Sequence, residues 1–237
     1  MANEDPWLHQ IAQMPAMQQV AAILAGLRDR GLQEPAVASG FIRSHVMGVP
    51  PTDVDIHYVG TVPTKTAEQW LAELLTAGNI TNRSWDIWNF TEHDPRITTT
   101  EFGYRAHFVS TIDCIYLAPD GALHDLTNRG VVDARTHTLE FCHLGVTNYR
   151  FEIGQLCYIY LEGCRRMFLH DLHPTPTSAL ALRNSASLWQ RCPAVDRAAL
   201  HKRLHEKLDA AQRAAAQPIY ASYGWDAIFA MDGINGS

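Results

Sequence analysis

The sequence lacks three features that would each narrow its role: a surplus of basic residues, a long apolar run and cysteines at metal-binding spacing. Lysine and arginine number 19 against 25 aspartates and glutamates, which gives a formal net charge of −6. Bulk charge therefore cannot hold this chain on nucleic acid, although a local basic patch still can. No apolar run approaches the length that spans a bilayer, so no membrane segment is expected.

Other absences concern the cellular compartment. The N-terminus, Met-Ala-Asn-Glu-Asp-Pro, is acidic and has no apolar segment of the kind found in signal peptides. The cysteines are odd in number and most have apolar neighbours, which predicts buried free thiols in a reducing compartment. The twelve histidines have no third ligand at metal spacing, so surface or core roles are expected. We therefore predict a cytoplasmic protein. The five cysteines are Cys114, Cys142, Cys157, Cys164 and Cys192.

The chain divides by pattern into an α/β domain, residues 1–145, and an all-helical C-terminal domain, residues 146–237. Apolar periodicity predicts helices in both parts, and Pro15 is expected to divide the first one. The expected helices are 6–31, 64–77 with Thr64 or Thr66 as its cap, 149–170, 177–192 and 194–216. The expected strands are 36–38, 53 to about 60, 84–90, 106–118 and 122–126, with a loop or weak hairpin at 91–105.

One stretch carries a pattern of chemical interest. A small-residue turn, Ser39-Gly40, precedes a short helix with Arg43, and a strand with Asp53 and Asp55 follows a Pro-Pro corner. Because side chains on a strand alternate, the two carboxylates face the same side. Adjacent carboxylates repel unless a cation lies between them, and hard oxygen ligands favour Mg²⁺. An isolated Asp-x-Asp is more often a solvated strand face, so the surrounding residues matter.

Those surroundings resemble the nucleotidyltransferase superfamily, which has the DNA polymerase beta-like fold. The family pattern is roughly Gly-Gly-x-Val-Arg-Asp-x-Leu-Leu-Gly-Arg-x-Pro-x-Asp-Ile-Asp, and this chain keeps its spacing from Gly40 through Arg43 and Gly48 to Asp53 and Asp55. A second segment, Thr-Ile-Asp-Cys at 111–114 followed by Asp-Gly-Ala-Leu at 120–123, is similar to the family's Thr-Ile-Asn-Ala and the turn after it. The likeness is greatest to the head domain of bacterial CCA-adding enzymes and poly(A) polymerases, and covers about residues 36–135.

The resemblance implies an α+β fold: a small mixed β-sheet flanked by helices, followed by an all-helical region. It implies that Asp53, Asp55 and Asp86 hold two Mg²⁺ ions and act in catalysis, and that Ser39, Gly40 and Arg43 bind the phosphates of an NTP. Asp86 has the alternative of being an exposed strand residue. Asp113 competes with it as the third carboxylate, although a structural role for Asp113 is the better expectation.

The implied activity is Mg²⁺-dependent transfer of a nucleoside monophosphate from an NTP to an acceptor hydroxyl, with release of pyrophosphate. An RNA 3′ end is the acceptor that the nearest likeness suggests. The chain departs from the family at Ser39, at Ser44 and at residues 108–110, and the helical half lacks the Glu-Asp-x-x-Arg base-reading motif. Two alternatives therefore stay open: a small-molecule or protein acceptor, and a catalytically degenerate nucleotide-binding protein.

Overall fold

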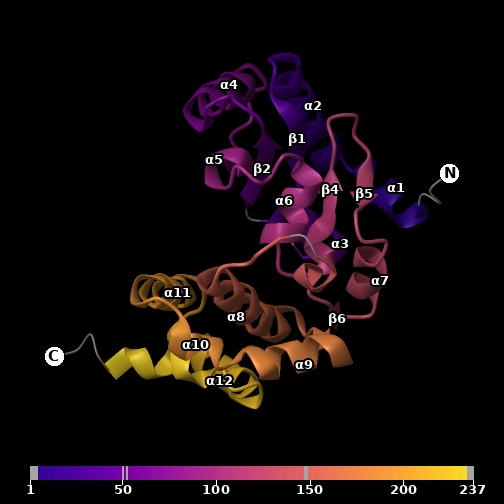
Figure 1. Cartoon of the computed structure of the whole chain (residues 1–237). Helices are drawn as coiled ribbons and strands as arrows, with labels where there is room; N and C mark the ends of the chain where they lie inside the picture. Colours follow the sequence, from indigo (N-terminus) through magenta and orange to yellow (C-terminus); the bar gives the residue numbers. More distant parts are fainter. Residues whose placement is uncertain (1–4, 50, 52, 147–148, 234–237) are drawn as a thin grey trace. The chain divides into compact units, whose positions relative to one another are not determined.

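The computed structural model describes residues 5–49, 51, 53–146 and 149–233 (Figure 1). The chain forms two compact units, residues 1–136 and 137–237. The division lies ahead of the boundary that the sequence suggested, between 145 and 146. Each unit is described by itself below.

The first unit is built on a five-stranded sheet in the order β3-β2-β1-β4-β5. Strands β2 and β3 are parallel, whereas β1 pairs antiparallel with both β2 and β4, and β4 with β5. The sheet is therefore mixed, as expected, and β3 is one of its edges. The strands are β1 (Gln33–Val37), β2 (Asp53–Val59), β3 (Ser84–Asn89), β4 (Ile115–Leu117) and β5 (Leu123–Asp125).

Helices supply the rest of this unit, and several match the predicted ranges. Pro15 divides the first helical segment, and α4 covers the expected 64–77. On β2, Val54, Ile56 and Tyr58 are fully buried and form one side of the core. The helices are α1 (Pro6–Ala12), α2 (Pro15–Asp29), α3 (Gly40–Val46), α4 (Thr64–Ala77), α5 (Phe90–His93), α6 (Thr100–His107) and α7 (Gly130–Arg135).

Three local predictions in this unit are wrong, two of them because a cap outweighed a propensity. The stretch 91–105, expected as a loop or hairpin, forms α5 and α6, whose first turns are capped by the side chains of Asn89 and Thr99. The expected strand 106–118 is reduced to β4, because Ser110 and Asp113 form a capping box on a 3₁₀ turn, η1 (Thr111–Cys114). Neither Thr64 nor Thr66 caps α4; Pro63 occupies that position without a side-chain hydrogen bond.

The second unit is mainly helical and packs around α8, which buries Cys157, Ile159, Tyr160 and Cys164. The expected helix 194–216 is divided in two at Leu208 and Asp209, and 177–192 is divided near Ala186. A short parallel strand pair also interrupts the all-helical expectation. The elements are β6 (Thr138–Leu139), α8 (Ile153–His170), β7 (His173–Pro174), α9 (Pro176–Ser185), α10 (Leu188–Arg191), α11 (Ala194–Lys207), α12 (Ala210–Ser222) and a 3₁₀ helix, η3 (Asp226–Gly233).

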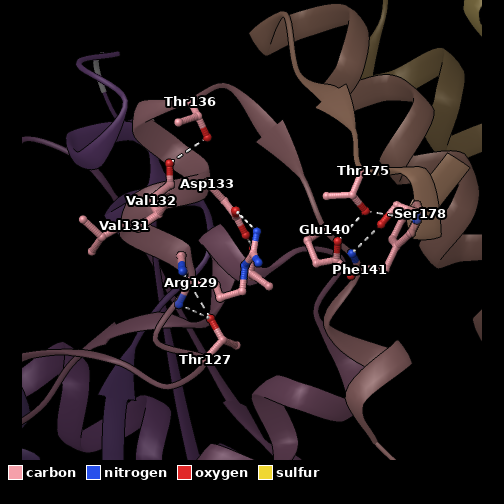
Figure 2. Close-up of polar contacts among 12 residues, drawn as sticks. Thr127, Arg129, Val131, Val132, Asp133, Thr136, Glu140, Phe141, Thr175 and Ser178 are labelled. Atoms are coloured by element: carbon pink, nitrogen blue, oxygen red, sulfur yellow. Dashed lines mark hydrogen bonds and ion pairs between the residues drawn. The ribbon is translucent and has the colours of Figure 1, made fainter.

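Polar contacts brace the segments on either side of the division (Figure 2). In the first unit, the Arg129 guanidinium donates to Asp133 of α7 at 2.9 Å. In the second unit, Thr175 donates to Glu140, and the Phe141 amide donates to the Ser178 hydroxyl at 3.2 Å. Each network thus stabilises its own unit. All five cysteines are buried free thiols, as expected, and no helix among the described residues is long and apolar enough to span a bilayer.

Candidate active site

The three predicted carboxylates come from two neighbouring parallel strands. Asp53 and Asp55 begin β2, and β2 runs in register with β3, so that Asp53 lies opposite Ser84 and Asp55 opposite Asp86. Parallel neighbours in register point to the same side of a sheet, and adjacent strands lie about 4.8 Å apart. The fold therefore places the three carboxylates on one side of β2 and β3. Asp53 and Asp55 are half-buried and Asp86 is exposed.

The Ser39-Gly40 turn lies directly against this carboxylate face. A Cβ atom built on Gly40 would be 3.6 Å from Oδ1 of Asp53. Ser39 has φ 57° and ψ −123°, a backbone conformation that suits glycine and strains any residue with a side chain. This is the position at which the resembling family has its first glycine. The chain thus keeps the shape of a glycine turn while placing a serine in it.

Arg43, predicted to contact phosphate, is engaged within the protein. Its side chain is 11% exposed and pairs with the fully buried carboxylate of Asp113 on η1. The same carboxylate accepts hydrogen bonds from the backbone amide of Ser110 at 2.9 Å and from its hydroxyl at 2.7 Å. Asp113 therefore fastens α3 to η1, which supports the structural role expected for it. Phosphate binding by Arg43 stays a prediction.

A second arginine reaches the same region, and the sequence patterns did not single it out. Arg83 immediately precedes Ser84, the strand partner of Asp53, and its guanidinium carbon lies 5.2 Å from the ring centroid of Phe41 on α3. Its Nη1 atom is buried and has no hydrogen-bond partner among the described residues. Nothing in the local pattern of a single arginine before a strand marks it as functional, because only the fold brings it to α3.

The residues present suit Mg²⁺ in chemistry and placement. Asp53 and Asp55 offer hard oxygen donors from one strand face, and Mg²⁺ is commonly held by one or two carboxylates with waters and substrate phosphates completing its shell. Among the described residues, no three side chains of His, Cys, Asp or Glu are gathered as a ready-made metal cage. A site completed by substrate is consistent with that arrangement. The role of Asp86 as a further ligand stays a prediction.

A groove of about 420 Å³ runs along the edge strand β3, between α4 and α5, and includes Asp86 in its lining. Trp85 in this groove is half-buried, whereas Trp88 is 47% exposed. Hydrogen bonds from the side chain and backbone of Thr64 hold the pKa of Glu92 below its usual range. The groove is thus aromatic and acidic. Its lining residues are Thr64, Glu68, Leu71, Ala72, Leu75, Trp85, Asp86, Ile87, Trp88, Glu92 and His93.

Beyond Asp55, the same side of β2 is closed by an aromatic cluster. His57 is buried and its ring contacts those of Phe90, Tyr104 and Phe108 at centroid distances of 5.0–5.4 Å. Burial, followed by repulsion from His107, lowers the pKa of His57 to about 3. His57 is therefore neutral at physiological pH, and the charged part of this face is confined to the aspartates.

Comparisons with known proteins give matches in structure alone. No family profile and no curated sequence matches this chain. The CCA-adding enzyme of Bacillus stearothermophilus in complex with CTP superposes with a TM-score of 0.65 at 16% identity, over 91% of this chain and 54% of that one. The Thermotoga maritima CCA-adding enzyme complexed with tRNA gives 0.59 at 13% identity, over 92% of this chain and 54% of that one.

A tRNA nucleotidyltransferase complexed with a primer tRNA and an incoming ATP analogue gives a TM-score of 0.61 at 13% identity, over 93% of this chain and 62% of that one. The chain therefore spans between half and two thirds of the length of these proteins. At such identities the likeness concerns the fold alone. It extends over 91–93% of this chain.

Proposed function

We propose, from the nucleotidyltransferase fold that this chain has, that it is a Mg²⁺-dependent nucleotidyltransferase. It transfers a nucleoside monophosphate from an NTP to an acceptor hydroxyl and releases pyrophosphate. The observation that carries the proposal is the placement of Asp53, Asp55 and Asp86 on one side of the parallel β2–β3 pair, beside the Ser39-Gly40 turn.

Each residue has a distinct task in this reaction. Asp53 and Asp55 hold Mg²⁺, which when bound supplies positive charge to the triphosphate and to the attacking hydroxyl. Asp86 accepts the hydroxyl proton as the acceptor oxygen bonds to the α-phosphorus and the bond to pyrophosphate breaks. The Ser39-Gly40 turn lets the phosphates approach the backbone closely, because Gly40 has no side chain to exclude them.

We propose an RNA 3′ end as the acceptor. The structurally similar proteins are described with CTP, with tRNA, or with a primer tRNA and an ATP analogue, which supports an NTP and an RNA as substrates. A small-molecule acceptor is the second candidate. It is favoured by the acidic, aromatic groove beside Asp86, because carboxylates repel the RNA backbone and suit neutral or cationic compounds.

The test is a labelling experiment with a matched control. The protein is incubated with Mg²⁺ and each α-³²P-labelled NTP, together with total tRNA or a panel of amino alcohols and sugars. The wild-type protein should label an acceptor, Asp55→Asn should not, and Asp29→Asn, an exposed aspartate on α2, should match the wild type. Label on RNA alone excludes the small-molecule acceptor, and label on a small compound alone excludes RNA.

The degenerate-protein alternative predicts a different result in the same experiment. NTP would bind without labelling any acceptor, and Asp55→Asn would leave that binding unchanged. If wild-type protein instead binds NTP only with Mg²⁺ and loses the binding in Asp55→Asn, the metal-dependent site is supported even before the acceptor is found.

A further inference from the structure

We propose that Arg83 is a triphosphate-binding residue of this site. The proposal rests on the proposed function, because it concerns how the NTP is held. Three observations carry it: the position of Arg83 beside the carboxylate face, its contact with Phe41, and a buried Nη1 atom that has no hydrogen-bond partner among the described residues.

The position is set by strand register. Arg83 leads directly into β3, whose first residue, Ser84, lies opposite Asp53. Phe41, against which the guanidinium lies, follows Gly40, and Gly40 in turn lies against Asp53. Arg83 is thus linked to the phosphate-side turn through α3 and to the aspartates through β3, although 42 positions in the sequence separate it from Phe41.

The two arginines near this site, Arg83 and Arg43, differ in their partners within the protein. A guanidinium has five N–H donors, and a buried donor without an acceptor has lost its hydration without gaining a hydrogen bond in return. Arg43 has a charged partner within the protein, because its Nη1 donates to the carboxylate of Asp113. Arg83 has no hydrogen bond or ion pair with any described residue, and its Nη1 is buried. The side chain is half-buried, so its remaining donors can still be reached by a ligand.

The chemistry fits phosphate oxygens. A planar guanidinium can donate two parallel hydrogen bonds to a phosphate, and stacking on an aromatic ring fixes its plane before the ligand arrives. The nearby Asp53 and Asp55 favour a cation in this region when no ligand is present. Arg43 cannot take this role without giving up its ion pair with the buried carboxylate of Asp113.

The test measures binding rather than turnover. Affinities for Mg²⁺–ATP, Mg²⁺–CTP and inorganic tripolyphosphate are determined by isothermal titration calorimetry for wild type, Arg83→Ala and Arg83→Lys. Arg28→Ala on α2, 52% exposed at its side chain, is the matched control. We expect Arg83→Ala to weaken NTP and tripolyphosphate binding about tenfold or more, Arg83→Lys to recover part of the loss, and Arg28→Ala to match the wild type.

The outcomes separate the two proposals. If wild type binds both NTP and tripolyphosphate and Arg83→Ala binds them equally well, the role of Arg83 is overturned while the proposed function stands. If wild type binds neither, both are overturned. Thermal melting of each variant is measured alongside, because loss of affinity with an unchanged melting temperature distinguishes a ligand contact from a folding defect. Arg83→Ala that melts with the wild type yet loses tripolyphosphate binding supports the proposal.

Discussion

Two clusters of charged side chains in this protein have opposite compositions. On β2 and β3, Asp53, Asp55 and Asp86 place three like charges on one side of the sheet. On α8 of the second unit, a single buried carboxylate, Glu162, is held by Arg165 at 2.6 Å and by Arg203 at 3.2 Å. In the second cluster the carboxylate is paired with arginines of the protein, whereas the first gathers carboxylates on one strand face and suits an external cation.

The pKa of Glu162 shows that the two arginines stabilise the charged form of its side chain. Burial pushes this pKa upward, but attraction and hydrogen bonds from Arg165 and Arg203 outweigh burial and hold it below its usual range. A buried carboxylate that is paired with arginines of the protein contributes to the stability of the fold without a bound ligand. A cluster of like charges works against stability, and its retention is explained when a metal or substrate compensates it.

The largest effect on the free energy of unfolding is expected from removing the Glu162 carboxylate. Glu162→Ala leaves two arginines beside the buried α8 position without their carboxylate, and loss of one partner of a buried ion pair costs about 3–5 kcal/mol. Urea denaturation followed by circular dichroism measures the change. A free energy of unfolding within 1 kcal/mol of wild type would show that this cluster is not the stabilising device that its geometry indicates.

The converse change removes a charge from the carboxylate cluster on β2 and β3. Asp55→Asn should lower nucleotidyl transfer by on the order of 10²–10³-fold, the range seen when one group that stabilises transition-state charge is removed. It should not lower the free energy of unfolding, because it relieves repulsion with Asp53 and Asp86. Initial-rate assays check the expected loss of transfer activity, and urea denaturation checks that the free energy of unfolding does not fall. A variant that loses stability and activity together would contradict the contrast between the two clusters.

Lowering the pH should destabilise both units, because each contains a buried histidine. Burial lowers the pKa of His57 to about 3 in the first unit and that of His143 to about 4 in the second. Both values lie below that of an unfolded histidine, about 6.5, so the unfolded chain takes up protons that the folded chain excludes. Stability should therefore be fully present above pH 6.5 and fall by about 1.4 kcal/mol per histidine for each pH unit below it.

Melting curves between pH 7 and pH 4.5 measure this effect. His57→Phe keeps a ring among Phe90, Tyr104 and Phe108 and should flatten the pH dependence that His57 contributes. If His57→Phe falls in stability with acid as steeply as the wild type, protonation of His57 is not what destabilises the first unit.

The smallest effect is expected at the strained turn. Ser39→Gly removes the side chain from a residue at φ 57° and should stabilise the first unit by about 1 kcal/mol. A rise in melting temperature with NTP affinity unchanged is the expected result. A fall in stability would mean that the serine hydroxyl compensates the strain.

Sequence patterns predicted that Asp53 and Asp55 face the same side of a strand, but they did not predict the contacts that the nearby arginines make. Strand periodicity predicted that Asp53 and Asp55 lie on one side, because that relation depends on local geometry. Asp86 was singled out only by the resemblance to the nucleotidyltransferase family. The Arg43–Asp113 pair joins residues 70 positions apart, and no local rule selects that partner for Arg43. The sequence patterns did not single out Arg83 either, because its contact with Phe41 also joins positions that are far apart in the chain.

Secondary structure shows the same limit. The range of α4 was predicted correctly from its apolar stripe, and the division at Pro15 from the proline itself. By contrast, α6 was missed because Thr98, Thr99 and Thr100 favour strands, whereas one of them acts as a helix cap. Short helices decided by a single capping hydrogen bond lie beyond what composition and periodicity can resolve.

The bond between Arg43 and Asp113 has a consequence for the order of folding. Closing a loop of 70 residues costs more entropy than forming a turn, so this contact is expected to form after local helices and the β4–β5 hairpin. The same buried aspartate also accepts from Ser110, and its backbone carbonyl accepts from the Ser39 amide at 3.3 Å. The wall of the proposed phosphate site is therefore completed late, and a chain folded only in its local segments lacks the proposed nucleotide site. Stopped-flow refolding with a fluorescent NTP should show binding that lags behind the recovery of helical signal.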